Sequence, residues 1–82
     1  MWIKSEDGRL FNLEMAHSVQ VEDRDNGQFV VVIEYSPIDL RSFNLTQRTR
    51  REAAYRVLDE IENALQRGET MLNLCPNGDC ND

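Results

Sequence analysis

Residues 28–35 read Gln-Phe-Val-Val-Val-Ile-Glu-Tyr, and this stretch predicts the central strand of a β-sheet. Side chains alternate between the two faces of a strand, and here both faces are apolar. One face carries Phe29, Val31, Ile33 and Tyr35, and the other carries Val30 and Val32. We expect the first face to pack against a helix. A single helix leaves the second face open, so Val30 and Val32 need cover from a loop, the C-terminal tail or another subunit, and they are the candidate interface residues.

Turn signals before this stretch predict the strands that pair with it. Asn26-Gly27 has the composition of a type I′ hairpin turn, and it joins the central strand to an alternating run over residues 17–22. Further toward the N-terminus, Asp7-Gly8 separates the short runs 2–5 and 9–13. The sequence therefore predicts an antiparallel β-meander of about four strands.

The C-terminal half predicts one amphipathic helix over residues 50–67. Its apolar positions follow helical spacing: Ala53, Ala54, Val57, Leu58, Ile61, Ala64 and Leu65. Thr49 and Glu52 have the spacing of a capping box, and Gly68 is typical of the residue that ends a helix. The predicted fold is α+β, with this helix packed on one face of the sheet.

The segments around the helix are harder to assign. Pro37 ends the central strand, because proline cannot donate a hydrogen bond to a neighbouring strand. Residues 36–48 then form a connection, and a short extra strand near residues 40–45 is an alternative. We expect one domain over residues 1–68, followed by a C-terminal tail over 69–82 that is partly mobile.

The composition is that of a small acidic globular protein. The chain has 82 residues, of which 40% are hydrophobic and 29% are charged, with a net charge of -6. It contains neither a long apolar run typical of a membrane span nor a leader-like N-terminus. We therefore expect a cytoplasmic protein that does not associate with membranes.

Basic side chains are concentrated between residues 41 and 56. This segment has five arginines (Arg41, Arg48, Arg50, Arg51, Arg56) and one acid, a local net charge of +4, while the rest of the chain carries -10. We expect these arginines to pair with carboxylates of the chain, for example Arg56 with Glu52 or Glu60. The alternative is an anion contact at Arg41, Arg48, Arg50 and Arg51, with nucleic acid as the partner.

Several short motifs carry a family resemblance. They are Met1-Trp2-Ile3, Asp7-Gly8, Asn12-Leu13, Glu52-Ala53-Ala54 and Val57-Leu58-Asp59-Glu60-Ile61. With them the chain resembles small uncharacterised bacterial and phage proteins that have a few strands followed by one helix. The resemblance covers roughly residues 1–67, and it implies a fold but no activity and no site residues. The cysteine-bearing tail departs from that pattern.

Candidate catalytic and metal-binding residues are few. His17 is the only histidine, and we expect it to have a structural role because no oriented partner can be assigned to it. Asp23, Asp25 and Glu34 have part of the spacing of a calcium-binding loop, but Gln28 stands where that loop needs glycine. We predict no catalytic site, no metal and no cofactor.

Two further features concern packing and redox state. We expect Trp2 to be buried in the core or in an interface, because an exposed indole leaves a large apolar area in water. Cys75 and Cys80 are expected to be free thiols. A disulfide between them, or a zinc site formed by two tails across a dimer, remains an alternative.

Together these observations predict a non-enzymatic domain that acts through protein association. We expect a homo-oligomer, most simply a homodimer, or a different protein partner. Nucleic-acid binding through the arginines is the alternative function, which the negative charge elsewhere in the chain disfavours.

Overall fold

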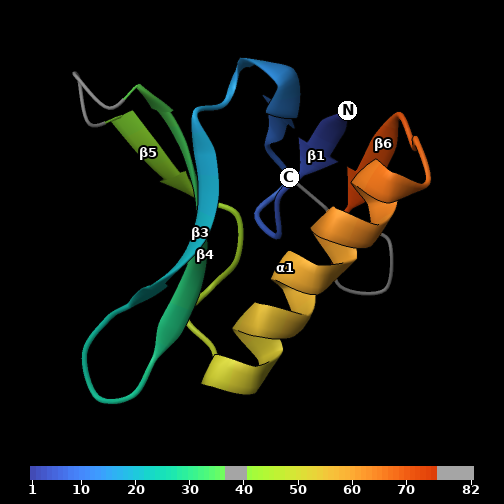
Figure 1. The fold of residues 1–82 in the computed structure, drawn as a ribbon. Helices are drawn as coiled ribbons and strands as arrows, with labels where there is room; N and C mark the ends of the chain where they lie inside the picture. The colour runs from blue at the N-terminus through green and yellow to red at the C-terminus, as the bar shows by residue number, and fades with distance from the viewer. Residues whose placement is uncertain (37–40, 76–82) are drawn as a thin grey trace.

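Two three-stranded sheets and one α-helix make up the fold (Figure 1). The structure is a computed structural model, which describes residues 1–36 and 41–75. In chain order the elements are β1 (Trp2–Lys4), β2 (Leu10–Asn12), the 3-10 helix η1 (Leu13–Met15), β3 (Ser18–Asp23), β4 (Phe29–Ser36), β5 (Arg41–Asn44), α1 (Arg51–Gln66) and β6 (Met71–Asn73). The predicted α+β class is confirmed, with six strands in the described ranges instead of about four.

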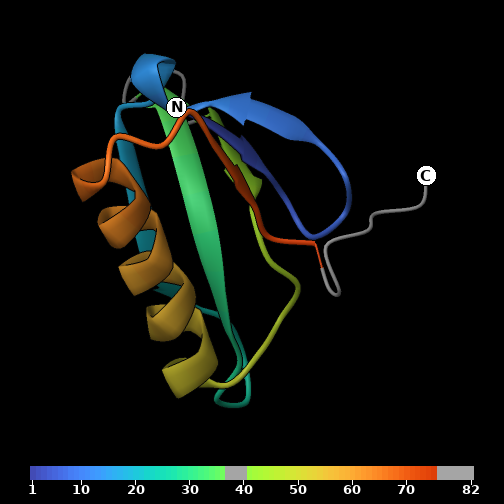
Figure 2. The same ribbon diagram turned by 90° about the vertical axis from the view of Figure 1, so that its right-hand side faces the viewer.

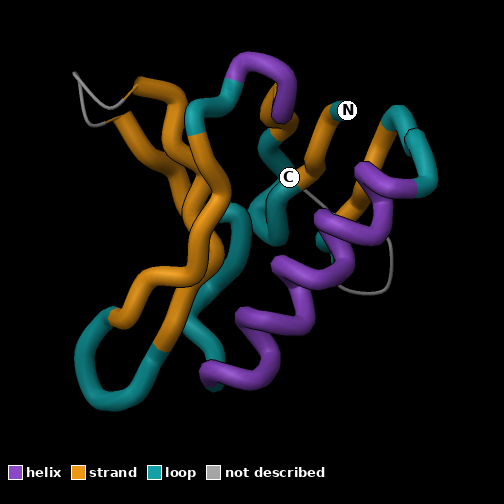
Figure 3. Tube along the Cα trace, viewed as in Figure 1, coloured by secondary structure: helices purple, strands orange, loops and turns teal. Residues whose placement is uncertain are grey.

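The strands are divided between the two sheets (Figure 3). The first has the order β2-β1-β6, in which β1 is antiparallel to β2 and parallel to β6. The second, β3-β4-β5, is antiparallel throughout, and its β5 is the extra strand that the sequence left open. Because β6 pairs with β1, the fold continues past residue 68. Residues 76–82 of the predicted tail lie outside the described residues.

The helix and the first sheet form one layer that covers the second sheet. Figure 2 shows α1 and the β2-β1-β6 sheet side by side on one face of β3-β4-β5. Between the layers lies a core of buried side chains: Ile3, Phe11, Val31, Ile33, Leu45, Ala54 and Ile61. The helix therefore packs on the predicted face of β4. In the part of the chain that the structure describes, no helix has the length and apolar character needed to cross a membrane.

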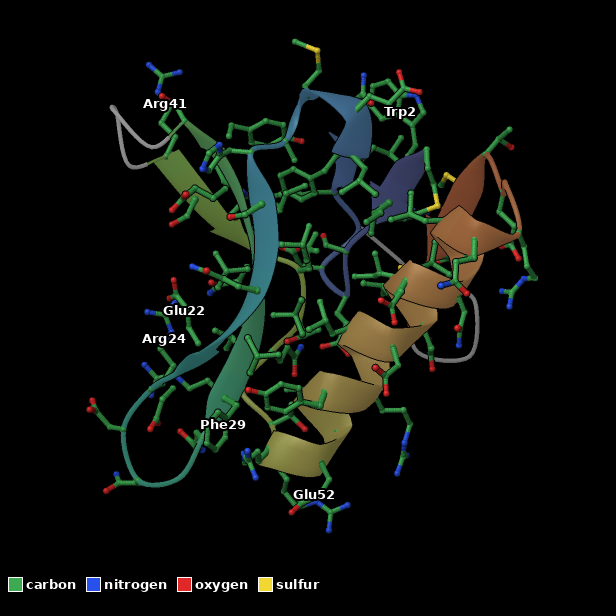
Figure 4. All side chains as sticks on the ribbon, in the orientation of Figure 1. Trp2, Glu22, Arg24, Phe29, Arg41 and Glu52 are labelled. Carbon is green, nitrogen blue, oxygen red and sulfur yellow. The ribbon has the colours of Figure 1, made fainter. Side chains whose placement is uncertain are left out.

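The opposite face of β3-β4-β5 is covered by polar side chains of the sheet itself. Val30 and Val32 are 1% and 0% exposed, so the prediction that they form an interface is wrong. Glu22 lies in β3 on one side of β4, and Asn44 lies in β5 on the other side. Nη2 of Arg24 lies 3.2 Å from Oε1 of Glu22 and 3.2 Å from Oδ1 of Asn44. Figure 4 shows Glu22 and Arg24 together on this side of the sheet. We call these three side chains the polar bridge; it covers β4 without a second subunit.

The predicted glycine turns form as expected. Asn26 and Gly27 have φ values of 60° and 71°, and the Gln28 amide donates a 3.2 Å hydrogen bond to the Asp25 carbonyl. Positive φ at both central positions is the requirement of a type I′ turn. Gly68, with φ 71°, ends α1 in the left-handed conformation.

The start of α1 differs from the prediction. The N-cap residue is Arg50, and no side chain caps it, so the predicted capping box of Thr49 and Glu52 is wrong. Thr49 instead pairs with Phe29 through two backbone hydrogen bonds of 2.8 Å. This strand-like pairing holds Thr49 outside the helix, where it cannot act as the cap.

The aromatic residues divide between core and surface. Trp2 is 48% exposed, because β1 turns this side chain away from the core while it buries Ile3. The prediction that Trp2 lies in the core is therefore wrong, and its burial in an interface stays a prediction. Phe11, Tyr35 and Phe43 form a cluster with ring centroids 5.4 to 6.3 Å apart. Burial raises the pKa of the Tyr35 hydroxyl, which donates a 3.2 Å hydrogen bond to a backbone carbonyl.

Candidate protein-binding groove

An open groove is lined by residues of η1, the start of β3 and the C-terminal half of α1. Figure 1 shows where α1 and β3 lie in the fold. The volume of the groove is about 750 Å³. The walls are mainly apolar, and all three elements contribute to them: Leu13, Ala16, Val19, Leu58, Ile61 and Leu65. Concave, mostly apolar surfaces of this size are typical of sites that bind a ligand or a segment of a partner.

One wall is positioned by the single turn of η1. Asn12 caps this turn, since its Oδ1 accepts a 3.0 Å hydrogen bond from the Glu14 amide. The Ala16 amide then donates a 3.0 Å hydrogen bond to the Leu13 carbonyl, which closes the turn. Leu13 and Ala16 pack against the core on one side and line the groove on the other.

The facing wall is the flank of α1. Ala54 and Ile61 are buried against the sheets, whereas Leu65 is 51% exposed and Leu58 is half-buried. Leu65, one of the apolar positions with which the predicted helix is expected to pack on the sheet, therefore lies outside the core. The apolar stripe of α1 is wider than the surface that the sheets offer to it, so its outer leucines remain beside the groove.

The rim of the groove is acidic. The charged side chains of its lining are Glu14 from η1 and Asp59 and Glu62 from α1, all of them carboxylates. The N-terminal ammonium of Met1, which also lines the groove, lies 3.7 Å from Oε1 of Glu14, so Asp59 and Glu62 are the two that form no ion pair with a described residue. Carboxylates around apolar walls attract cations and repel anions. The arrangement suits a segment that presents apolar side chains with basic residues beside them.

The lining of the groove includes His17, the histidine that the sequence predicts to have a structural role. Its side chain is exposed, and its backbone amide donates a 2.7 Å hydrogen bond to the Glu34 carbonyl. Within residues 1–36 and 41–75, no three His, Cys, Asp or Glu side chains are grouped to hold a metal. Of the partial calcium pattern, Glu34 pairs with Ser18 at one end of the β3-β4 hairpin, whereas Asp25 lies in the turn at the other end.

The arginine segment is not neutralised as expected. No ion pair joins a described carboxylate to any of its five arginines: Arg41, Arg48, Arg50, Arg51 and Arg56. Arg48 donates a 3.4 Å hydrogen bond to Gln28 instead, and the Arg51 guanidinium lies 5.3 Å from the centroid of the Tyr55 ring. The prediction of internal pairing is therefore wrong for the residues that the structure describes.

The structure also divides this segment. Figure 4 shows Arg41 at one end of the molecule and Glu52, in the first turn of α1, at the other. Arg48, Arg50 and Arg51 lie around the start of α1, because they immediately precede or begin it. The four predicted anion contacts therefore do not form one surface.

Cys75 is buried and disulfide-bonded, so it is not the free thiol that the sequence predicts. Its Sγ lies 3.2 Å from the carbonyl oxygen of Ser5, close to the β1-β2 turn. A sulfur in a disulfide is not a thiolate, and a cysteine binds zinc in a structural site only as the thiolate. Cys80 lies outside the described residues.

The sequence did not predict the groove, because its walls come from η1, β3 and α1, and α1 is distant along the chain from the other two. Comparisons with protein-family models, curated proteins and solved structures found no match to this chain. The function is therefore argued from the shape and charge of the groove.

Proposed function

We propose that this chain is a non-enzymatic protein-association domain, and that its groove binds an amphipathic segment of a partner protein. The observation that supports the proposal is a set of exposed or half-buried apolar walls inside a rim of carboxylates. Covering the walls removes apolar surface from water, at about 25 cal/mol for each Å². The carboxylates favour basic residues at the edges of the bound segment and disfavour acidic ones.

Two synthetic peptides test this proposal. They share one apolar face and length, but one has arginines on its flanks and the other has glutamates. In a titration of the isotope-labelled chain followed by NMR, we expect the arginine peptide to shift amide signals of residues 13–19 and 58–65. The glutamate peptide should shift them little, because the rim repels it.

Matched leucine variants locate the binding surface. Leu65→Asp should weaken binding of the arginine peptide by at least about tenfold, since it puts a charge in an apolar wall. Leu10→Asp is the control, because Leu10 is 56% exposed on β2 and does not line the groove. Equal binding of the two peptides, or unchanged binding by Leu65→Asp, would refute the proposal.

The competing function is nucleic-acid binding around the start of α1. It is favoured by Arg48, Arg50 and Arg51, which form no ion pair with a described carboxylate. It is opposed by the net charge of -6, which repels phosphate at longer range. Micromolar binding to a nonspecific duplex at physiological salt, lost when all three arginines become alanine, would establish this function instead.

A cytoplasmic location remains part of the proposal. Reducing compartments keep thiols free, whereas the structure has Cys75 in a disulfide. Alkylation of thiols in intact cells that make the protein decides the point. Labelled Cys75 supports the cytoplasm, and a protected disulfide contradicts it.

A further inference from the structure

One flank of α1 carries a row of side chains spaced alternately by four and three residues: Arg51, Tyr55, Leu58, Glu62 and Leu65. This spacing keeps the five side chains on one side of a helix, as in the seam of a coiled coil. The last three line the groove, and Tyr55 and Leu65 are largely exposed. We call these residues the α1 row; it extends from the first turn of the helix into the groove.

The α1 row is charged oppositely at its two ends. Arg51 lies in the first turn and Glu62 in the second half of α1, and neither forms an ion pair with another described residue. A helix macrodipole disfavours a cation near the N-terminus and an anion near the C-terminus. Arg51 contacts the Tyr55 ring, 5.3 Å from its centroid, but neither charge is favoured by the macrodipole of its own helix.

We infer that a second copy of this chain fills the groove, in a symmetric dimer whose two α1 helices pack antiparallel. This inference rests on the proposed function and names its partner. In a pair of antiparallel helices, all residues that face each other have the same midpoint along the helix. If Arg51 faces Glu62 of the second copy, Tyr55 therefore faces Leu58 of that copy. A two-fold axis repeats each contact, so the interface contains two charge pairs and two apolar pairs.

Charge complementarity selects a second copy over an unrelated partner. The groove requires an apolar segment with a basic residue beside it, and the first half of the α1 row is such a segment. The rest of the row supplies the matching acid, Glu62, and Leu58 as the apolar contact for Tyr55. The α1 row is therefore complementary in charge and in apolar contacts to the same row of a second, antiparallel copy. An interface of two charge pairs and two apolar pairs is small and joins two acidic subunits, so we expect a weak dimer with a dissociation constant in the micromolar range.

Charge reversal tests the predicted register by sedimentation equilibrium of the full chain. Arg51→Glu and Glu62→Arg each replace two attractions by two repulsions, and each should raise the dissociation constant by at least about tenfold. The double variant Arg51→Glu/Glu62→Arg restores opposite charges across the axis, and it should return the constant to within about threefold of wild type. Both substitutions agree with the helix macrodipole, so the monomer should stay folded, which circular dichroism confirms.

The outcomes separate this inference from the proposed function. A wild-type chain that stays monomeric at high micromolar concentration overturns the dimer, and so does a dimer that the double variant fails to restore. If the arginine peptide still binds in the groove, the proposed function stands and the partner is another protein. If neither the peptide nor a second copy binds, both proposals fall.

Discussion

Replacing Ile61 by alanine should remove a central contact between α1 and the sheets. Ile61 is 3% exposed and belongs to the cluster that contains Val31 and Ile33. The substitution deletes three carbon atoms, a transfer loss of about 2.4 kcal/mol at roughly 0.8 kcal/mol for each. A residual cavity of roughly 60 Å³ adds about 1.4 kcal/mol at roughly 24 cal/mol per Å³. We expect the free energy of unfolding to fall by about 3 to 4 kcal/mol.

Urea unfolding followed by circular dichroism measures this loss, at low micromolar concentration so that association adds little to stability. The control is Leu65→Ala, which deletes as many atoms from the same helix at a position that is 51% exposed. It should cost less than about 1 kcal/mol. Similar losses for the two variants would refute the assignment of Ile61 to the core and of Leu65 to the surface, because they would mean that α1 presents a different face to the sheets.

Two further variants probe the start of α1 and the aromatic cluster. Arg50→Asp should raise the free energy of unfolding by about 1 kcal/mol, since Asp accepts from the uncapped amides of the first turn; no gain would mean that these amides already have partners. Because burial raises the pKa of Tyr35, the unfolded chain loses this proton at a lower pH than the folded chain. Stability should therefore fall as the pH rises through about 10, and Tyr35→Phe should flatten this slope. An unchanged slope in Tyr35→Phe would contradict the argument.

The features that the sequence predicts correctly depend on neighbours along the chain. Asn26-Gly27 forms its turn because positive φ is a property of those two residues. The helix over Arg51–Gln66 follows from spacing within sixteen residues, and Gly68 ends it for the reason expected. Local chemistry was sufficient in each case.

The features that the sequence misses depend on segments that are distant along the chain. Val30 and Val32 are buried because Arg24 and Asn44, which lie on either side of β4, come within hydrogen-bonding distance of each other. No pattern within one strand reveals such a cover. The groove likewise exists only because η1 is folded opposite Leu65. The capping box failed for the same reason, since Phe29 holds the residue that would have formed it.

The pairing of β1 with β6 has a consequence for the order of folding. Trp2 meets Met71 across about 70 residues of chain, and closing a loop of that length costs about 4 kcal/mol of entropy. The strands β3, β4 and β5 are separated by short connections, so the entropy cost of pairing them is smaller. During synthesis one edge of β1 therefore stays unpaired until the ribosome has produced α1 and β6. An edge left open for that interval is where a nascent chain is most exposed to pairing with a neighbour.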